Sequence, residues 1–144
     1  MARPSAEWHP QQVPAQAQVH KKRVLLVNDS RDEREMYAEW LRRQGYCTLQ
    51  TTNATDGYRM AMELHPDVVV TDIKLSGSCN GLDLTRQLKE QPQTLGVPVV
   101  ILSGYVFKSD SDDAARVGCD LFLGKPCLPE ALSHAIERLL IRRA

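Results

Sequence analysis

Polar side chains stand at the ends of several apolar runs of strand length. They are Asn28 and Asp29, Asp72, Ser103 and Lys125. Carboxylate oxygens are the ligands that Mg²⁺ prefers, together with water and phosphate oxygens. A lysine ammonium and a hydroxyl can hold a phosphoryl group, and a carboxylate can itself be the nucleophile that becomes an aspartyl-phosphate. These residue types therefore indicate phosphoryl-transfer chemistry, provided that the fold brings them together.

The hydrophobic pattern predicts strands that alternate with helices. Apolar runs of strand length occupy residues 24–27, 68–71, 97–102 and 121–123, with a weaker run at 46–51. Helical periodicity is found at about residues 30–45, 54–64, 82–90 and 109–117, and from Pro129 onward. Strand and helix thus alternate five times with short connections, which predicts a parallel sheet with helices on both faces. Chemistry in such α/β sheets occurs at the carboxyl ends of the strands, where the polar residues stand.

The first and last helices carry the clearest local signals. Ser30 and Glu33 match the S-x-x-E pattern of a capping box, and Gly45 is expected to end the first helix. The residues expected on the inner faces are Met36, Tyr37, Trp40 and Leu41 in the first helix and Leu132, Ile136, Leu139 and Leu140 in the last. Pro129 suits the first turn of the last helix.

Length and composition predict one domain with a terminal tail. Residues 1–20 are rich in Pro and Gln and are expected to form a flexible tail, so that the domain covers residues 21–144. The 18 basic and 18 acidic residues balance, so bulk charge does not favour binding to nucleic acid. No apolar stretch approaches the length of a membrane span, and no signal peptide is recognisable. We therefore expect a cytoplasmic protein that binds neither nucleic acid nor membrane.

Four motifs together resemble the receiver domain of two-component response regulators. In chain order they are VLLVND, VVVTDIKLSGSCNGLDL, VVILSGY and LFLGKP, and the resemblance extends over about residues 22–142. Each motif alone is weak, but all four stand in order at expected strand ends. The resemblance implies a flavodoxin-like (βα)5 three-layer sandwich with a parallel five-stranded sheet in the order 2-1-3-4-5.

The same resemblance implies a role for each polar residue. Asp72 would be the phosphoacceptor, with Lys125 and Ser103 assisting. Mg²⁺ would be the cofactor, bound by Asp29, by Asp72 and by the main-chain carbonyl of Lys74. Ser103 and Phe122 would form the switch that responds to phosphorylation, and the Lys125–Pro126 peptide bond would be cis.

Two positions depart from the usual receiver pattern. Asn28 stands where the family usually has a first acidic residue, and Leu75-Ser76-Gly77 replaces a loop that usually contains proline. Because an amide removes one negative charge, Asn28 is expected to contact the metal weakly or through water. We therefore expect Mg²⁺ to bind more weakly than in a receiver with two acids there, and Asn28→Asp to tighten the binding.

The resemblance implies a signalling protein rather than an enzyme. A histidine kinase or histidine phosphotransfer protein would phosphorylate Asp72, and the only chemistry of the chain itself would be autocatalytic phosphotransfer and slow self-dephosphorylation. Since the sequence stops soon after the last helix, we expect no output domain to follow. Output would then pass to a protein partner bound on the face formed by the fourth helix, fifth strand and fifth helix.

Three other functions compete with this one. Asn28 favours a phosphorylation-independent pseudo-receiver that acts as a binding module. A flavin-binding protein with the same sheet order is disfavoured because the loop at residues 28–32 is short and acidic rather than rich in Ser, Thr and Gly donors. A serine hydrolase is disfavoured because Ile101 stands where the nucleophile motif G-x-S-x-G requires glycine.

Overall fold

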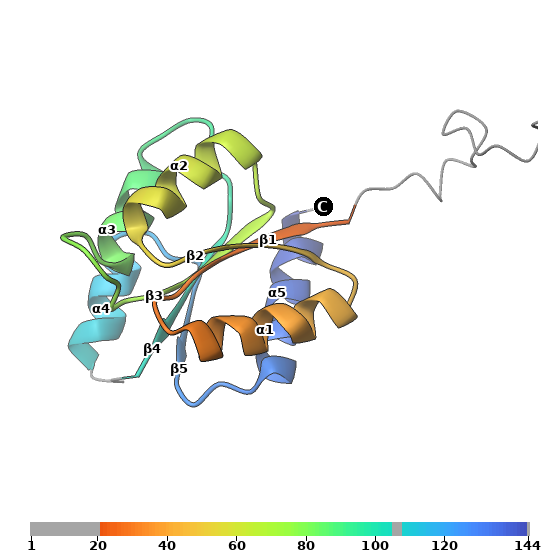
Figure 1. The fold of residues 1–144 in the computed structure, drawn as a ribbon. Helices are drawn as coiled ribbons and strands as arrows, with labels where there is room; N and C mark the ends of the chain where they lie inside the picture. Colours follow the sequence, from red (N-terminus) through yellow and green to blue (C-terminus); the bar gives the residue numbers. More distant parts are fainter. Residues whose placement is uncertain (1–20, 105–107, 144) are drawn as a thin grey trace, which may run out of the picture.

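A single parallel sheet forms the centre of the molecule (Figure 1). The computed structural model describes residues 21–104 and 108–143, so the tail expected at residues 1–20 lies outside the described residues. Within this part the strands are β1 (Arg23–Val27), β2 (Cys47–Thr51), β3 (Val68–Asp72), β4 (Val99–Ser103) and β5 (Leu121–Gly124). Their order is β2-β1-β3-β4-β5, and every neighbouring pair is parallel. The predicted fold class and strand order are confirmed.

The helices cover both faces of this sheet. They are α1 (Arg31–Arg43), α2 (Ala54–Leu64), α3 (Gly81–Lys89), α4 (Lys108–Arg116) and α5 (Pro129–Arg143). In Figure 1, α1 and α5 lie on one side of the strands, and α2, α3 and α4 lie on the other. The molecule therefore has the three layers that the alternation of strands and helices predicted.

Alternating residues of the central strands build two separate hydrophobic cores. Val24 and Leu26 of β1 pack with residues of α1 and α5, whereas Leu25 and Val27 pack with residues of α2, α3 and α4. All four side chains are buried. Since full burial of one such side chain stabilises a protein by about 1.5 to 3 kcal/mol, both faces hold β1 in position.

The register of the strands brings their carboxyl ends to one edge. Val27 pairs with Thr71, Asp72 pairs with Leu102, and Ser103 pairs with Gly124. The residues that follow β1, β3, β4 and β5 therefore emerge side by side. This register is what places the predicted chemical groups near one another.

The fourth strand begins later than predicted. The apolar run at residues 97–102 suggested a start at Val97, but the strand begins at Val99. Pro98 precedes the strand and has no N–H group to donate to a neighbour, although its carbonyl accepts a hydrogen bond from the Val69 N–H at 3.0 Å. The Val97 N–H donates to the Thr94 carbonyl within a turn, so Val97 belongs to the connection before the strand.

The first helix differs from the prediction in its cap and in its buried face. Ser30 is the N-cap and its hydroxyl accepts a hydrogen bond from the Glu33 N–H, but the Ser30 N–H donates to the Asn28 side chain rather than to Glu33. Only half of the predicted capping box therefore forms. Met36 was expected on the inner face, but it is 44% exposed, because the buried face of α1 is formed by Tyr37, Ala38 and Leu41. A complete capping box occurs instead at the start of α3, between Asn80 and Asp83.

The last helix follows the prediction more closely. It begins at Pro129, and Leu132, Ile136 and Leu139 are buried against the sheet. With 15 residues it is the longest of the described helices. Across residues 21–104 and 108–143, no helix combines the length and the apolar character needed to span a bilayer.

Candidate functional site

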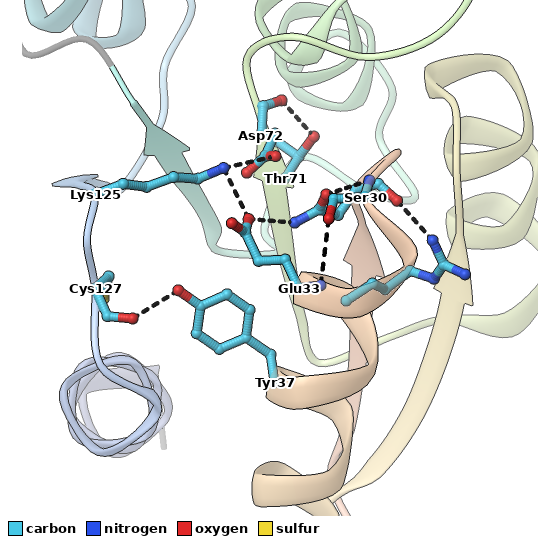
Figure 2. Close-up of polar contacts among 9 residues, drawn as sticks. Ser30, Glu33, Tyr37, Thr71, Asp72, Lys125 and Cys127 are labelled. Carbon is cyan, nitrogen blue, oxygen red and sulfur yellow. Dashed lines mark hydrogen bonds and ion pairs between the residues drawn. The ribbon is translucent and has the colours of Figure 1, made fainter.

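Asp72 and Lys125 meet at the carboxyl edge of the sheet. Asp72 is the last residue of β3 and is only 6% exposed. The Lys125 ammonium, just after β5, donates to the Asp72 Oδ2 atom at 2.9 Å (Figure 2). The backbone N–H of Lys125 also donates to the Ser103 carbonyl at 2.7 Å, which ties the end of β5 to the end of β4. The structure thus brings together two residues that are 53 positions apart in the sequence.

A cavity of about 240 Å³ opens beside this ion pair. Its lining residues are Asp72, Ile73, Lys74, Leu102, Ser103, Gly104, Asp110 and Lys125. Both the predicted phosphoacceptor, Asp72, and the predicted hydroxyl residue, Ser103, therefore line this cavity. Lys74, whose carbonyl was expected to bind the metal, also lines the cavity. The lining residues thus include two aspartates, two lysines and a serine.

The two oxygens of the Asp72 carboxylate have different surroundings. Oδ2 is paired with Lys125, whereas Oδ1 is buried and has no hydrogen-bond partner within the described part of the chain. Burial raises the pKa of Asp72 to about 6, and the negative charges of Glu33 and Asp29 raise it as well, although Lys125 opposes the shift. The carboxylate therefore carries a negative charge that its protein neighbours compensate only in part.

Asp29 and Phe122 lie outside the lining of that cavity. Asp29 is exposed, but its charge is close enough to Asp72 to raise the pKa of that carboxyl. Phe122 is partly buried and packs against the core beneath α2, α3 and α4. Their assigned roles, as metal ligand and as switch residue, stay predictions.

The side chain of Asn28 is engaged on both sides. Its Oδ1 atom accepts a hydrogen bond from the Ser30 N–H at 2.8 Å, and its Nδ2 atom donates to the Glu33 Oε1 atom at 2.6 Å. The residue is only 4% exposed. Arg34 donates to the Asn28 carbonyl at 2.9 Å, which fixes the backbone there too. A weak or water-mediated contact of Asn28 with a metal stays a prediction.

Glu33 lies at the site, although the sequence pattern predicted only a helix-capping role for it. Its Oε1 atom accepts from Lys125 Nζ at 2.7 Å, so Lys125 bridges Glu33 and Asp72 (Figure 2). Glu33 was interpreted as part of a capping box, which concealed a second signal. It is an acid in the first turn of the helix that directly follows β1, so it starts close to the strand end that carries Asn28 and Asp29.

A tyrosine on α1 supports the loop that carries Lys125. The Tyr37 hydroxyl donates to the Cys127 carbonyl at 2.6 Å, as Figure 2 shows. Burial is the largest cause that raises the pKa of Tyr37. The Lys125–Pro126 peptide bond is cis, as the resemblance implied.

The donor atoms at this edge suit Mg²⁺. Asp29 and Asp72 carry the hard carboxylate oxygens that Mg²⁺ prefers, and the buried Oδ1 of Asp72, which has no hydrogen-bond partner among the described residues, is the kind of atom that a cation satisfies. Across residues 21–104 and 108–143, no three His, Cys, Asp or Glu side chains converge as a ready-made metal cluster. A site with two carboxylates and a carbonyl matches Mg²⁺, because this ion keeps several waters and takes phosphate oxygens.

Comparison with known proteins identifies the family. A model of the response regulator receiver domain matches residues 24–137. The chain therefore belongs to this family, whose members act in two-component signalling. This membership leaves the flavin-binding alternative without support.

Individual relatives agree with this membership. The chain is 28% identical over 105 residues to the polar-differentiation response regulator DivK of Brucella ovis, covering 73% of this chain and 85% of that protein. The receiver domain of a signal transduction histidine kinase from Syntrophus aciditrophicus has 29% identity and a TM-score of 0.77, covering 83% of this chain and 89% of that one. The receiver domain of sensor histidine kinase PA1611 from Pseudomonas aeruginosa, solved with magnesium in its active-site cleft, shares the fold with 22% identity and a TM-score of 0.77. That alignment covers 84% of this chain and 98% of that one.

Proposed function

We propose that this receiver domain accepts a phosphoryl group on Asp72. The observation that carries the proposal is the state of the Asp72 carboxylate, which has one oxygen on Lys125 and one without a partner in the described part of the chain, beside a cavity that Ser103 also lines. The donor would be a phosphohistidine of a histidine kinase or a histidine phosphotransfer protein.

The transfer requires little of the protein beyond alignment and charge. An oxygen of Asp72 forms a bond to phosphorus while the phosphorus–nitrogen bond of the donor breaks and its electron pair stays on the imidazole. Lys125 and Ser103 both line the cavity, so the ammonium would neutralise one phosphoryl oxygen and the hydroxyl would donate to another. Asp29, Asp72 and the Lys74 carbonyl would hold Mg²⁺, which favours the ionised carboxylate and screens the phosphoryl oxygens. Slow attack by water would later release phosphate and restore the carboxylate.

Output would pass through the face next to the cavity. Ser103, drawn toward the phosphoryl group, would leave space that Phe122 fills, and the change would reach α4, β5 and α5. A protein partner would bind there. The predicted surface began at Val106, which lies outside the described residues, so the proposal rests on Lys108–Arg116 and on the elements after it.

The pseudo-receiver remains a second candidate because of one observation. Asn28 supplies an amide where a metal site benefits from charge, and both ends of that amide are already hydrogen-bonded within the protein. A domain of this kind would bind its partner without phosphorylation. It would keep the fold and the Lys125–Asp72 ion pair but would not be modified at Asp72.

Mass spectrometry after treatment with acetyl phosphate distinguishes the two. With Mg²⁺, the wild-type chain should gain one phosphoryl group on the peptide that contains Asp72, and a chelator should prevent it. Asp72→Asn should abolish the modification, whereas Asp56→Asn, on α2 and outside the cavity lining, should leave it intact. An unmodified wild-type chain, or a label that persists in Asp72→Asn, would favour the pseudo-receiver.

The location and the excluded partners belong to the same proposal. We infer that the domain works in the cytoplasm, where histidine kinases present their phosphohistidines, and that it signals through protein contacts rather than through nucleic acid. The balanced charge of 18 basic and 18 acidic residues supports the second statement.

A further inference from the structure

One carboxylate oxygen of Glu33 joins two residues of the site. Glu33 Oε1 accepts from Lys125 Nζ at 2.7 Å and from Asn28 Nδ2 at 2.6 Å. The first contact is shorter than the 2.9 Å contact between Lys125 and Asp72. Glu33 is also partly buried, with 27% of its side chain exposed, so solvent screens these contacts less than it would at the surface.

The position of this carboxylate is not explained by the needs of α1. The backbone N–H of Ser30, which Glu33 would bind in a capping box, donates to Asn28 instead. Asp32 also lies in the first turn and supplies the negative charge that favours a helix start, yet it is exposed. Glu33 instead reaches the strand ends, where it contacts Lys125 (Figure 2).

Asn28 and Glu33 are chemically matched. The Asn28 Nδ2 group is a donor and needs an acceptor, which the Glu33 carboxylate provides. A carboxylate at position 28 would instead face the Glu33 carboxylate at hydrogen-bond distance, and two like charges this close repel. The Asn28 amide therefore allows the Glu33 carboxylate to approach the end of β1.

We propose that Glu33 is a positioning residue of this site, which holds Lys125 beside Asp72 and supplies the negative charge that Asn28 lacks. The proposal deepens the proposed function and rests on it. Glu33 then adds its negative charge to those of Asp29 and Asp72, at an edge whose cavity Lys74, Asp110 and Lys125 also line. Two of the three Lys125 donor hydrogens are used by Glu33 and Asp72, which leaves one for a phosphoryl oxygen.

The first test measures the hold on Lys125 in the metal-free protein. Acetylation with a limiting amount of an amine-reactive ester, quantified peptide by peptide, reports how freely each lysine reacts. Glu33→Gln keeps the shape and a possible hydrogen bond to Asn28 but removes the charge, so Lys125 should react several-fold faster. Glu35→Gln removes the same charge from an exposed position of the same helix and should leave Lys125 unchanged. An unchanged Lys125 rate in Glu33→Gln would overturn the positioning role.

The second test measures the charge through the affinity for Mg²⁺ by calorimetric titration. Loss of one negative charge near a divalent ion should weaken binding about three- to tenfold in Glu33→Gln. The double variant Asn28→Asp with Glu33→Gln moves the acid back to the strand end and reverses the hydrogen bond, so its affinity should return to within about threefold of wild type or exceed it. Equal affinities in wild type and Glu33→Gln, or a double variant as weak as Glu33→Gln, would refute the compensating charge.

These readouts separate the inference from the proposed function. If acetyl phosphate does not modify the wild type but Lys125 still reacts faster in Glu33→Gln, the proposed function fails and the positioning of Lys125 stands. If phosphorylation occurs normally, Lys125 reacts equally fast in Glu33→Gln and Glu35→Gln, and Glu33→Gln binds Mg²⁺ as tightly as wild type, the proposed function stands and the inference about Glu33 is wrong.

Discussion

Gly81, the first residue of α3, lies directly against the main-chain carbonyl of Asp72. A Cβ atom added at Gly81 would collide with the oxygen and carbon of that carbonyl and crowd the Ile73 Cα atom. The Gly81 N–H also donates to the Ile73 carbonyl at 2.8 Å. The absence of a side chain therefore allows α3 to start against the segment that carries the proposed phosphoacceptor.

Gly81→Ala should consequently destabilise the fold. The atoms in the way are backbone, which cannot rotate aside, so we expect a loss of about 2 to 3 kcal/mol in the free energy of unfolding. Urea denaturation followed by circular dichroism measures this change. Gly104→Ala is the control, because a Cβ there meets no atom of the described residues within 4 Å. If the two variants have similar free energies of unfolding, the close contact between Gly81 and the Asp72 carbonyl does not exclude a side chain at position 81.

Asp72→Asn should change how stability depends on pH in the presence of a chelator. Burial raises the pKa of Asp72 to about 6, above its ordinary value near 4. Between these values the folded chain binds more protons than the unfolded chain, so wild-type stability should fall as pH rises through this window. The substituted amide carries no charge at any of these pH values, so the stability of the variant should not decrease with pH in this window. Allowing for its weaker contact with Lys125, Asp72→Asn should be more stable than wild type by about 1 to 2 kcal/mol at pH 7.5.

The measurement for Asp72→Asn is urea denaturation at pH 4.5 and at pH 7.5. The advantage of the variant should be larger at the higher pH. Asp56→Asn, whose side chain is in an exposed ion pair with Arg59, is the control and should not reproduce the effect. Parallel pH profiles for wild type and Asp72→Asn would contradict the raised pKa.

Tyr37→Phe should weaken the connection between α1 and the loop after β5. The substitution leaves the Cys127 carbonyl without its donor, and the loss of one partly buried hydrogen bond costs about 1 kcal/mol. Thermal or urea unfolding measures the cost. Tyr58→Phe is the matched control, since the Tyr58 side chain is also partly buried but its hydroxyl has no hydrogen bond in the described ranges. If both variants lose the same stability, the bond to Cys127 contributes nothing specific.

Ser103→Ala should interrupt the proposed switch without unfolding the protein. Ser103 is buried beside the cavity, and its methyl counterpart fits the same space but cannot donate a hydrogen bond to a phosphoryl oxygen. Amide NMR spectra with and without beryllofluoride, a phosphoryl mimic, measure the response. In wild type the shifts should extend to α4, β5 and α5, and in Ser103→Ala they should stay near Asp72. Long-range shifts that survive in Ser103→Ala would remove Ser103 from the switch.

The sequence by itself predicted the layers and the edge of the sheet at which the candidate residues lie. Apolar runs of strand length alternated with helical segments, and this local pattern depends only on neighbours a few positions away. Because parallel strands end at one edge, the placement of Asp72, Ser103 and Lys125 followed from the strand ends alone. In the structure all three residues line one cavity at that edge, while their roles stay predictions.

The tertiary structure decided which side chains meet across that edge. The pattern Ser30-x-x-Glu33 predicts a capping box from local spacing, but Asn28 takes the Ser30 N–H and leaves Glu33 to bind Lys125. That outcome depends on how far α1 and the end of β5 approach each other, which no local pattern encodes. The raised pKa of Asp72 likewise follows from burial by residues far apart in the chain. Contacts between distant segments arise from the packing of the helices on the sheet. They therefore depend on the whole tertiary structure rather than on local sequence.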